Sequence, residues 1–144
     1  MSDGPVVQLL SERADVEATF PVVKQLRPHL TLETYADTIA RLHATGFRLA
    51  AVKVGGQIVA VAGYRRSESL AWGAHYYVDD LVTAENVRSR GYGKMLLDWL
   101  KNAALAEGCA SLQLDSGVQR CSAHRFYLRE RMDITCHHFG IVLK

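Results

Sequence analysis

Hydrophobic positions repeat with two periods along this chain, and these periods predict an alternation of strands and helices. Short runs rich in β-branched residues favour strands, whereas apolar residues spaced three to four apart favour amphipathic helices. Strands are expected over residues 6–10, 47–54, 58–64, 75–83, 111–115 and 134–143, and helices over residues 15–27, 31–45, 90–107 and 121–131. This order predicts an α/β fold with a mixed sheet and helices on both of its faces.

Local signals sharpen several of these boundaries. Thr31 is placed to cap the second helix, and Pro21 is expected to kink the first. Gly55-Gly56 separates two strand patterns and predicts a hairpin turn, while Gly108 fits the end of the third helix. The polar stretch 65–73 is expected to be a loop or a fraying strand end.

Length, charge and composition mainly argue against some classes of protein. The chain has 144 residues, which predicts one domain over 1–144, and its net charge of +2 is too small to indicate a nucleic-acid partner. No apolar run reaches the roughly 20 residues of a membrane span. The first residues also lack the basic start and apolar core of a signal peptide. Three widely spaced cysteines fit a reduced, cytoplasmic protein.

The strongest chemical signal is the stretch Arg88-Ser89-Arg90-Gly91-Tyr92-Gly93 between a predicted strand and a predicted helix. The first amides of a helix have no internal partner and carry partial positive charge, so such an entrance suits phosphate. The stretch is not a P-loop, because Met95 follows Lys94, and it lacks the third glycine of a dinucleotide fingerprint. A purely structural turn is the alternative at this point.

With its flanks, this motif resembles the signature of the GCN5-related N-acetyltransferases (GNAT), Arg/Gln-x-x-Gly-x-Gly/Ala. The preceding strand Tyr77–Thr83, the helix start Gly93–Leu97 and the order of elements over nearly the whole chain match as well. The resemblance implies a mixed, mostly antiparallel sheet with splayed central strands and acetyl-CoA as co-substrate. It also implies cofactor contacts from Leu81, Val82, Thr83, Arg88, Ser89, Arg90, Gly91, Tyr92, Gly93 and Lys94.

In this family the acetyl group passes to an amine, and the amine attacks directly through a tetrahedral intermediate. Such a reaction needs a neutral amine, a stabilised oxyanion and a proton for the leaving thiolate, but no nucleophilic residue. Tyr127 matches the family tyrosine that supplies this proton. Without the resemblance, Phe126 and Tyr127 are better explained as core aromatics.

The deprotonating group is left open between Asp79, Asp80 and water. Adjacent residues of a regular strand face opposite sides, so at most one aspartate is expected to face the acceptor. Either could bind a cationic amine or polarise water, and Asp80 could instead pair with Arg88 or His75.

The chain departs from the family pattern in two places. Residues 119–122 stand where members commonly have an asparagine, and Arg131-Met132 replaces the usual Gly-Phe, which predicts a differently shaped final turn. No metal is expected, because Cys136-His137-His138 alternate faces in a strand.

The expected partners are a small-molecule or peptide amine, and a second copy of the chain in a homodimer. A non-catalytic acyl-CoA-binding or sensing module and an unrelated phosphate-binding α/β protein are the competing functions.

Overall fold

A five-stranded sheet with strand order β1-β2-β3-β4-β5 organises most of the chain in the computed structural model. The structure describes residues 4–144, so Met1–Asp3, on which the expectation about a signal peptide partly rests, lie outside the described residues. The elements are β1 (Val6–Leu10), α1 (Arg13–Ala18), α2 (Phe20–Leu26), α3 (Leu32–His43), β2 (Phe47–Val54), β3 (Gln57–Ser69), β4 (Gly73–Thr83), the 3-10 turn η1 (Glu85–Val87), α4 (Tyr92–Ala106), β5 (Ser111–Leu114) and α5 (Cys121–Arg129).

The chain divides into two compact units, a first unit ending at Gln113 and a second unit from Leu114 to Lys144. The first unit holds α1–α4 and nearly the whole sheet, and the second unit holds α5. The single domain expected over 1–144 therefore stays a prediction.

Strands β1–β4 of the first unit pair in chain order, and their directions agree with the mostly antiparallel sheet that the resemblance implies. β1 with β2, β2 with β3, and β3 with β4 are all antiparallel. The β2–β3 turn places Gly55 at φ 55° and Gly56 at φ 82°, the positive values that a tight hairpin turn requires and that glycine adopts without strain.

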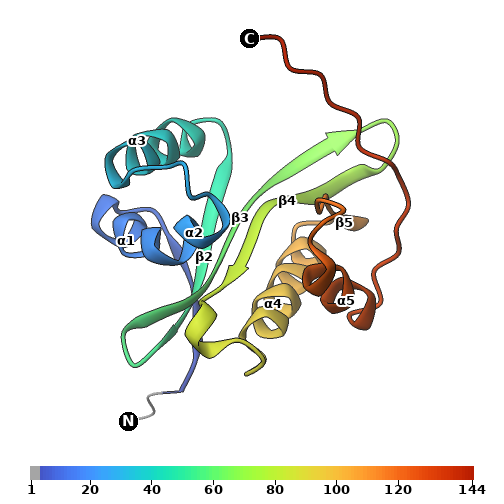
Figure 1. The fold of residues 1–144 in the computed structure, drawn as a ribbon. Helices are drawn as coiled ribbons and strands as arrows, with labels where there is room; N and C mark the ends of the chain where they lie inside the picture. Colours follow the sequence, from blue (N-terminus) through green and yellow to red (C-terminus); the bar gives the residue numbers. More distant parts are fainter. Residues whose placement is uncertain (1–3) are drawn as a thin grey trace. The chain divides into compact units, whose positions relative to one another are not determined.

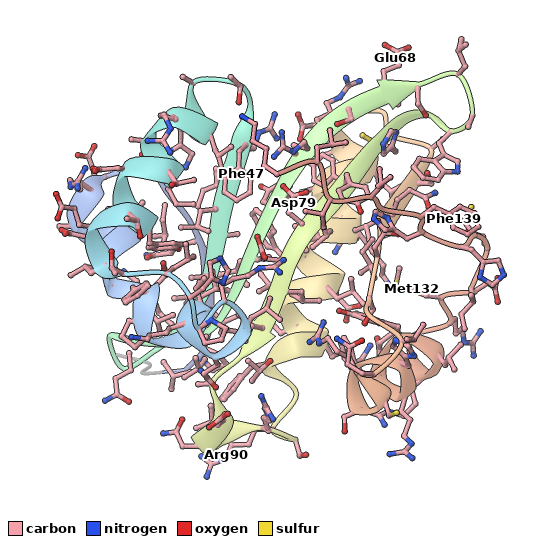
Figure 2. The ribbon with its side chains drawn as sticks, turned by 45° about the horizontal axis from the view of Figure 1, so that its top comes forward. Phe47, Glu68, Asp79, Arg90, Met132 and Phe139 are labelled. Atoms are coloured by element: carbon pink, nitrogen blue, oxygen red, sulfur yellow. The ribbon has the colours of Figure 1, made fainter. Side chains whose placement is uncertain are left out.

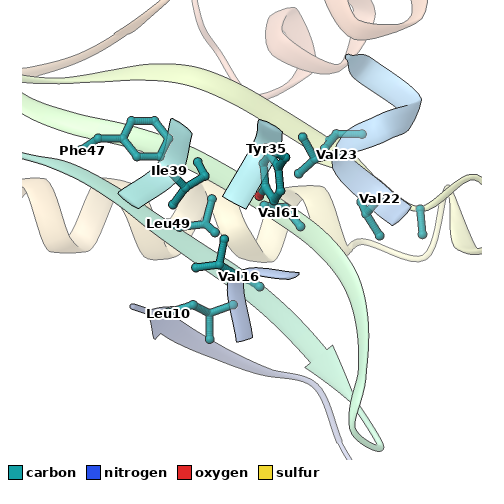
Figure 3. Close-up of a cluster of buried hydrophobic side chains, with 12 residues drawn as sticks. Leu10, Val16, Val22, Val23, Tyr35, Ile39, Phe47, Leu49 and Val61 are labelled. Carbon is teal, nitrogen blue, oxygen red and sulfur yellow. The ribbon is translucent and has the colours of Figure 1, made fainter. Parts of the chain in front are cut away.

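Helices cover both faces of the sheet in the first unit (Figure 1), which confirms that expectation. The amphipathic α4 packs Leu96, Leu97 and Leu100 against one face, where they are almost fully buried. The other face forms a separate core with α1–α3 (Figure 3). Its buried members are Leu10, Val16, Val22, Val23, Tyr35, Ile39, Phe47, Leu49, Ala51, Val61, Val82 and Ala84.

The helix boundaries follow the local signals. Thr31 caps α3 in a capping box with Thr34, in which each side chain accepts a hydrogen bond from the other's backbone N–H. At Pro21 the expected kink is a complete break, because α1 ends at Ala18 and α2 begins at Phe20.

Two expectations about secondary structure are wrong. The polar stretch 65–73 is largely strand, because β3 continues to Ser69 and pairs with β4 as far as Gly73. Residues 134–143 form no strand, and their apolar side chains Ile134, Phe139 and Ile141 are exposed. Backbone pairing decides both cases, since a polar strand is stable beside a partner whereas strand propensity alone does not make a strand.

Candidate functional site

The loop between β4 and α4 is fixed at its start by two hydrogen bonds that backbone amides donate. The Ala84 amide donates to the Val59 carbonyl at 2.8 Å, and the Glu85 amide donates to Oε1 of Gln25 at 2.8 Å. The loop then reaches left-handed conformations at Ser89, with φ 68°, and at Gly91, with φ 85°. These two residues turn the chain into α4.

The N-terminus of α4 is built without the groups that usually satisfy a helix start. Gly91 is the N-cap and provides no side chain, and the first turn contains no acidic residue. An ideal Cβ added to Gly91 would meet no atom within 4 Å, so the N-cap position itself is not crowded. Arg88 and Arg90 are exposed beside it, and Arg90 is labelled in Figure 2. This geometry suits an anion.

Beside this loop, the last part of β4 has an edge that β5 does not reach. The Ala110 amide, directly before β5, donates to the Ala74 carbonyl at the start of β4. β5 has only 4 residues, whereas β4 has 11. A strand of four residues that begins opposite Ala74 ends before it reaches Leu81–Thr83, whichever way it runs. β5 therefore does not pair with the outer backbone edge of those three residues, and an extended ligand could pair there as an added strand.

A β-bulge in β4 sets the directions of Asp79 and Asp80. Gly63 pairs with Asp80 and the next residue, Tyr64, pairs with Val78, so Asp79 is the extra residue. The extra residue breaks the regular alternation of faces. The two carboxylates therefore lie on the same face of the sheet, the face that carries Phe47, and the expectation that they face opposite sides is wrong.

Contacts around Phe47 establish this arrangement. A Cβ added to Gly63 would overlap the Phe47 ring and lie 3.4 Å from Oδ2 of Asp80. The Arg65 guanidinium carbon lies 5.6 Å from the centroid of the same ring, and Arg65 Nη2 donates to Oδ2 of Asp79 at 2.9 Å. Phe47 and Asp79, which this guanidinium joins, are labelled in Figure 2.

Each aspartate is ion-paired with an arginine that the sequence analysis did not single out. Arg65 Nε also donates to Oδ2 of Asp79 at 3.2 Å. Arg27, directly after α2, donates from Nε to Oδ1 of Asp80 at 2.7 Å and from Nη2 to the Asp79 carbonyl at 3.3 Å. Asp80 thus pairs with Arg27, not with Arg88 or His75. We call Arg27, Arg65, Asp79 and Asp80 the arginine–aspartate cluster.

Tyr127 lies on α5 in the second unit, where its side chain is half-buried. Burial raises the pKa of its hydroxyl, and the nearby Arg120 guanidinium opposes that shift. The phenol therefore stays protonated at neutral pH and can donate. One turn earlier, the His124 ring hydrogen-bonds the Gly117 carbonyl at 2.8 Å and supports the start of α5.

The turn after α5 keeps a glycine-like shape although it contains no glycine. Arg131 has φ 68°, its amide donates to the Leu128 carbonyl, and the Met132 amide donates to the Tyr127 carbonyl, both at 3.0 Å. These two bonds form a Schellman motif with Arg131 in the left-handed position. Arg131 thus adopts the backbone conformation for which glycine is usually used at this position. The expected difference in shape from the family's turn stays a prediction.

Residues 4–144 contain neither of two other features that would bear on function. No helix in this range is long and apolar enough to span a membrane. No three His, Cys, Asp or Glu side chains in it gather as a metal site, and His138 instead lies 3.3 Å from an Asp115 carboxylate oxygen.

The sequence matches the model of the acetyltransferase (GNAT) family over residues 13–132. It is 36% identical over 119 residues to an uncharacterised N-acetyltransferase, YhdJ, of Bacillus subtilis, covering 82% of this chain and 84% of that protein. A shorter match, 36% identical over 53 residues, covers 37% of this chain and 34% of an aminoalkylphosphonate N-acetyltransferase of Salmonella typhimurium.

Solved structures share the fold at lower identity. An aminoglycoside N-acetyltransferase, AAC(6')-Iy, in complex with CoA superposes with a TM-score of 0.81 at 13% identity, over 96% of this chain and 94% of that one. A ribosomal-protein-alanine N-acetyltransferase of Brucella melitensis has a TM-score of 0.83 at 16% identity, over 97% of this chain and 100% of that one.

Proposed function

Because the chain belongs to the acetyltransferase (GNAT) family, we propose that it moves the acetyl group of acetyl-CoA to a primary amine. The observation that carries this proposal is the uncapped start of α4 within Arg88–Gly93, together with the part of β4 that β5 does not pair with. A helix start suited to an anion and an unpaired strand edge fit a ligand with a phosphorylated end and an extended, amide-bearing arm.

The residues present fit coenzyme A at both of these places. We assign the pyrophosphate to the amides of residues 89–94, with Arg88 and Arg90 supplying positive charge. The backbone of Leu81–Thr83 would hold the pantetheine arm as an added strand. The coenzyme A in the solved AAC(6')-Iy complex supports the choice of ligand.

The proposed chemistry is direct transfer. Acetyl-CoA supplies the acetyl group as a thioester. Asp79, Asp80 or a water held by them takes the proton that the amine loses, and backbone groups at the end of β4 stabilise the oxyanion. The amine forms the C–N bond when it attacks the thioester carbonyl. Tyr127 then donates its phenolic proton to the leaving sulfur as the tetrahedral intermediate collapses and the C–S bond breaks. In this proposal both units act as one domain over 1–144.

A thiol-release assay tests this function directly. Acetyl-CoA is mixed with the full chain and a panel of primary amines, and free thiol is measured against reactions without amine. The proposal expects amine-dependent release, and mass spectrometry of the product should show one added acetyl group.

Binding is measured in parallel, as the melting temperature with and without acetyl-CoA. Stabilisation should approach about 2.7 kcal/mol at a concentration a hundred times the Kd. Stabilisation without release for any amine would favour the acyl-CoA-binding module. No stabilisation at all would favour a phosphate-binding protein unrelated to coenzyme A.

A further inference from the structure

The arginine–aspartate cluster contains two positive and two negative side chains, and this balance bears on the acceptor. We propose that Arg27 and Arg65 bind an acidic group of the acceptor, so that the preferred substrates are amines that also carry a carboxylate or phosphonate. This inference rests on the proposed function and deepens it by naming the substrate class.

The carboxylates of the cluster are already neutralised. Asp79 lies 2.9 Å from Arg65 and Asp80 lies 2.6 Å from Arg27 in their closest ion-pair contacts. An acceptor with several positive charges therefore meets a neutral cluster and gains little net attraction from it. An amine that also carries an acidic group can place its positive group beside an aspartate and its negative group beside an arginine of the same cluster.

The arginines keep hydrogen-bond donors for such a group. A guanidinium has five N–H donors in a planar fork. Arg27 and Arg65 each bind their aspartate through Nε and Nη2, and neither Nη1 group has a partner among residues 4–144. The Arg27 and Arg65 side chains are 44% and 33% exposed, so a ligand can reach them.

The cluster is also held in place before any ligand binds. Arg65 lies over the Phe47 ring, and Arg27 is fixed by both the Asp80 carboxylate and the Asp79 carbonyl. Arginines held in this way lose little side-chain entropy when a carboxylate or phosphonate binds. Asp80 directly precedes Leu81, the first of the residues assigned to the pantetheine arm, so the acidic group would bind close to the reacting end.

Four amines of similar length test this inference. They carry, besides the amine, a carboxylate, a phosphonate, a hydroxyl or a second amine, and kcat/KM is measured for each with acetyl-CoA. The two acid-bearing amines should exceed the other two by roughly 10- to 100-fold, as expected for charge-assisted hydrogen bonds. The carboxylate and phosphonate arms show which acid is preferred.

Variants identify the groups responsible. Arg27→Gln and Arg65→Gln should raise KM for acid-bearing amines roughly 10-fold or more with a smaller change in kcat, and each frees an aspartate, so the diamine should improve. Arg27→Lys should restore part of the affinity. Arg13→Gln removes a comparable surface ion pair, with Asp37 on α3, and should leave the ranking of amines unchanged.

Calorimetry with coenzyme A present separates this inference from the proposed function, because it measures amine binding without turnover. Tighter binding of acid-bearing amines that depends on Arg27 and Arg65 supports the inference even if no thiol is released. Equal or better binding of the hydroxyl amine or the diamine, or equal losses for all four amines in both arginine variants, would overturn it.

Discussion

Tyr127 is the residue on which the proposed protonation of the leaving sulfur depends. Tyr127→Phe removes only the hydroxyl, and turnover should fall roughly 10- to 1000-fold, the range expected for loss of acid catalysis. Affinity for acetyl-CoA should be nearly unchanged, because the assigned coenzyme A contacts are elsewhere in the chain. Thiol-release rates and melting-temperature shifts measure the two effects separately, and an unchanged rate would contradict the assignment.

Gly91 is the residue on which the proposed pyrophosphate site depends. Gly91→Glu places a negative charge at the N-cap position of α4, and binding of acetyl-CoA should be lost. Gly46→Glu is a matched control, since Gly46 also has a positive φ, of 100°, and an added Cβ there meets no atom within 4 Å. Both variants carry similar backbone strain. Calorimetric titration with acetyl-CoA should therefore separate them, and binding retained by Gly91→Glu would rule out this phosphate site.

Single residues also mark what the sequence could not reveal about the site. The spacing of Arg88, Gly91 and Gly93 before an apolar helix was readable, because the proposed anion site is built from consecutive residues. The arginine–aspartate cluster was not, because Arg27 and Asp80 are 53 positions apart. The bulge at Asp79 was hidden as well, since it is a property of the pairing with β3.

At the level of elements, the strands and helices buried on one or both sides were predicted closely. β2 has the bounds expected for it, and α4 begins two residues after the expected position. Prediction was wrong where pairing overrides composition, as in the polar half of β3 and in residues 134–143. An apolar pattern shows which side chains a segment could bury, but it does not show which strand or helix packs against that segment.

The turn after α5 provides a test at this level. Arg131→Gly should increase the free energy of unfolding by about 1 kcal/mol, because a left-handed conformation costs a residue with a Cβ roughly that amount. Arg129→Gly, two residues earlier in the regular helix, should instead lower it by about 1 kcal/mol. Urea unfolding of both variants measures the contrast. Two destabilised variants would mean that the Arg131 side chain makes a contact worth more than the strain.

For the whole molecule, stability should depend on the phenol of Tyr35, which projects from α3 into the hydrophobic core. Tyr35 is 3% exposed, and its hydroxyl lies 2.6 Å from Oγ1 of Thr19. The Thr19 hydroxyl donates to the Val16 carbonyl, so Tyr35 must be the donor to Thr19. Burial is the main cause that raises the pKa of Tyr35 to about 12, and the nearby Asp80 carboxylate adds to the shift.

The sign of the pH dependence follows from this shift. An unfolded tyrosine ionises near pH 10, so only the unfolded state loses this proton between about pH 10 and 12. Stability is therefore full below pH 10 and falls as the pH rises towards 12. Between pH 9 and 11 the loss from this one group should be about 1.4 kcal/mol.

Comparison with Tyr35→Phe isolates the contribution of this group. The variant should lose about 1 kcal/mol at pH 8 with the hydrogen bond to Thr19, but it should lose less stability than the parent between pH 9 and 11. Tyr64 and Tyr127, whose pKa values are also raised by burial, are present in both proteins and cancel in the difference. Urea unfolding at the three pH values gives the result, and parallel slopes would show that Tyr35 ionises equally well in the folded chain.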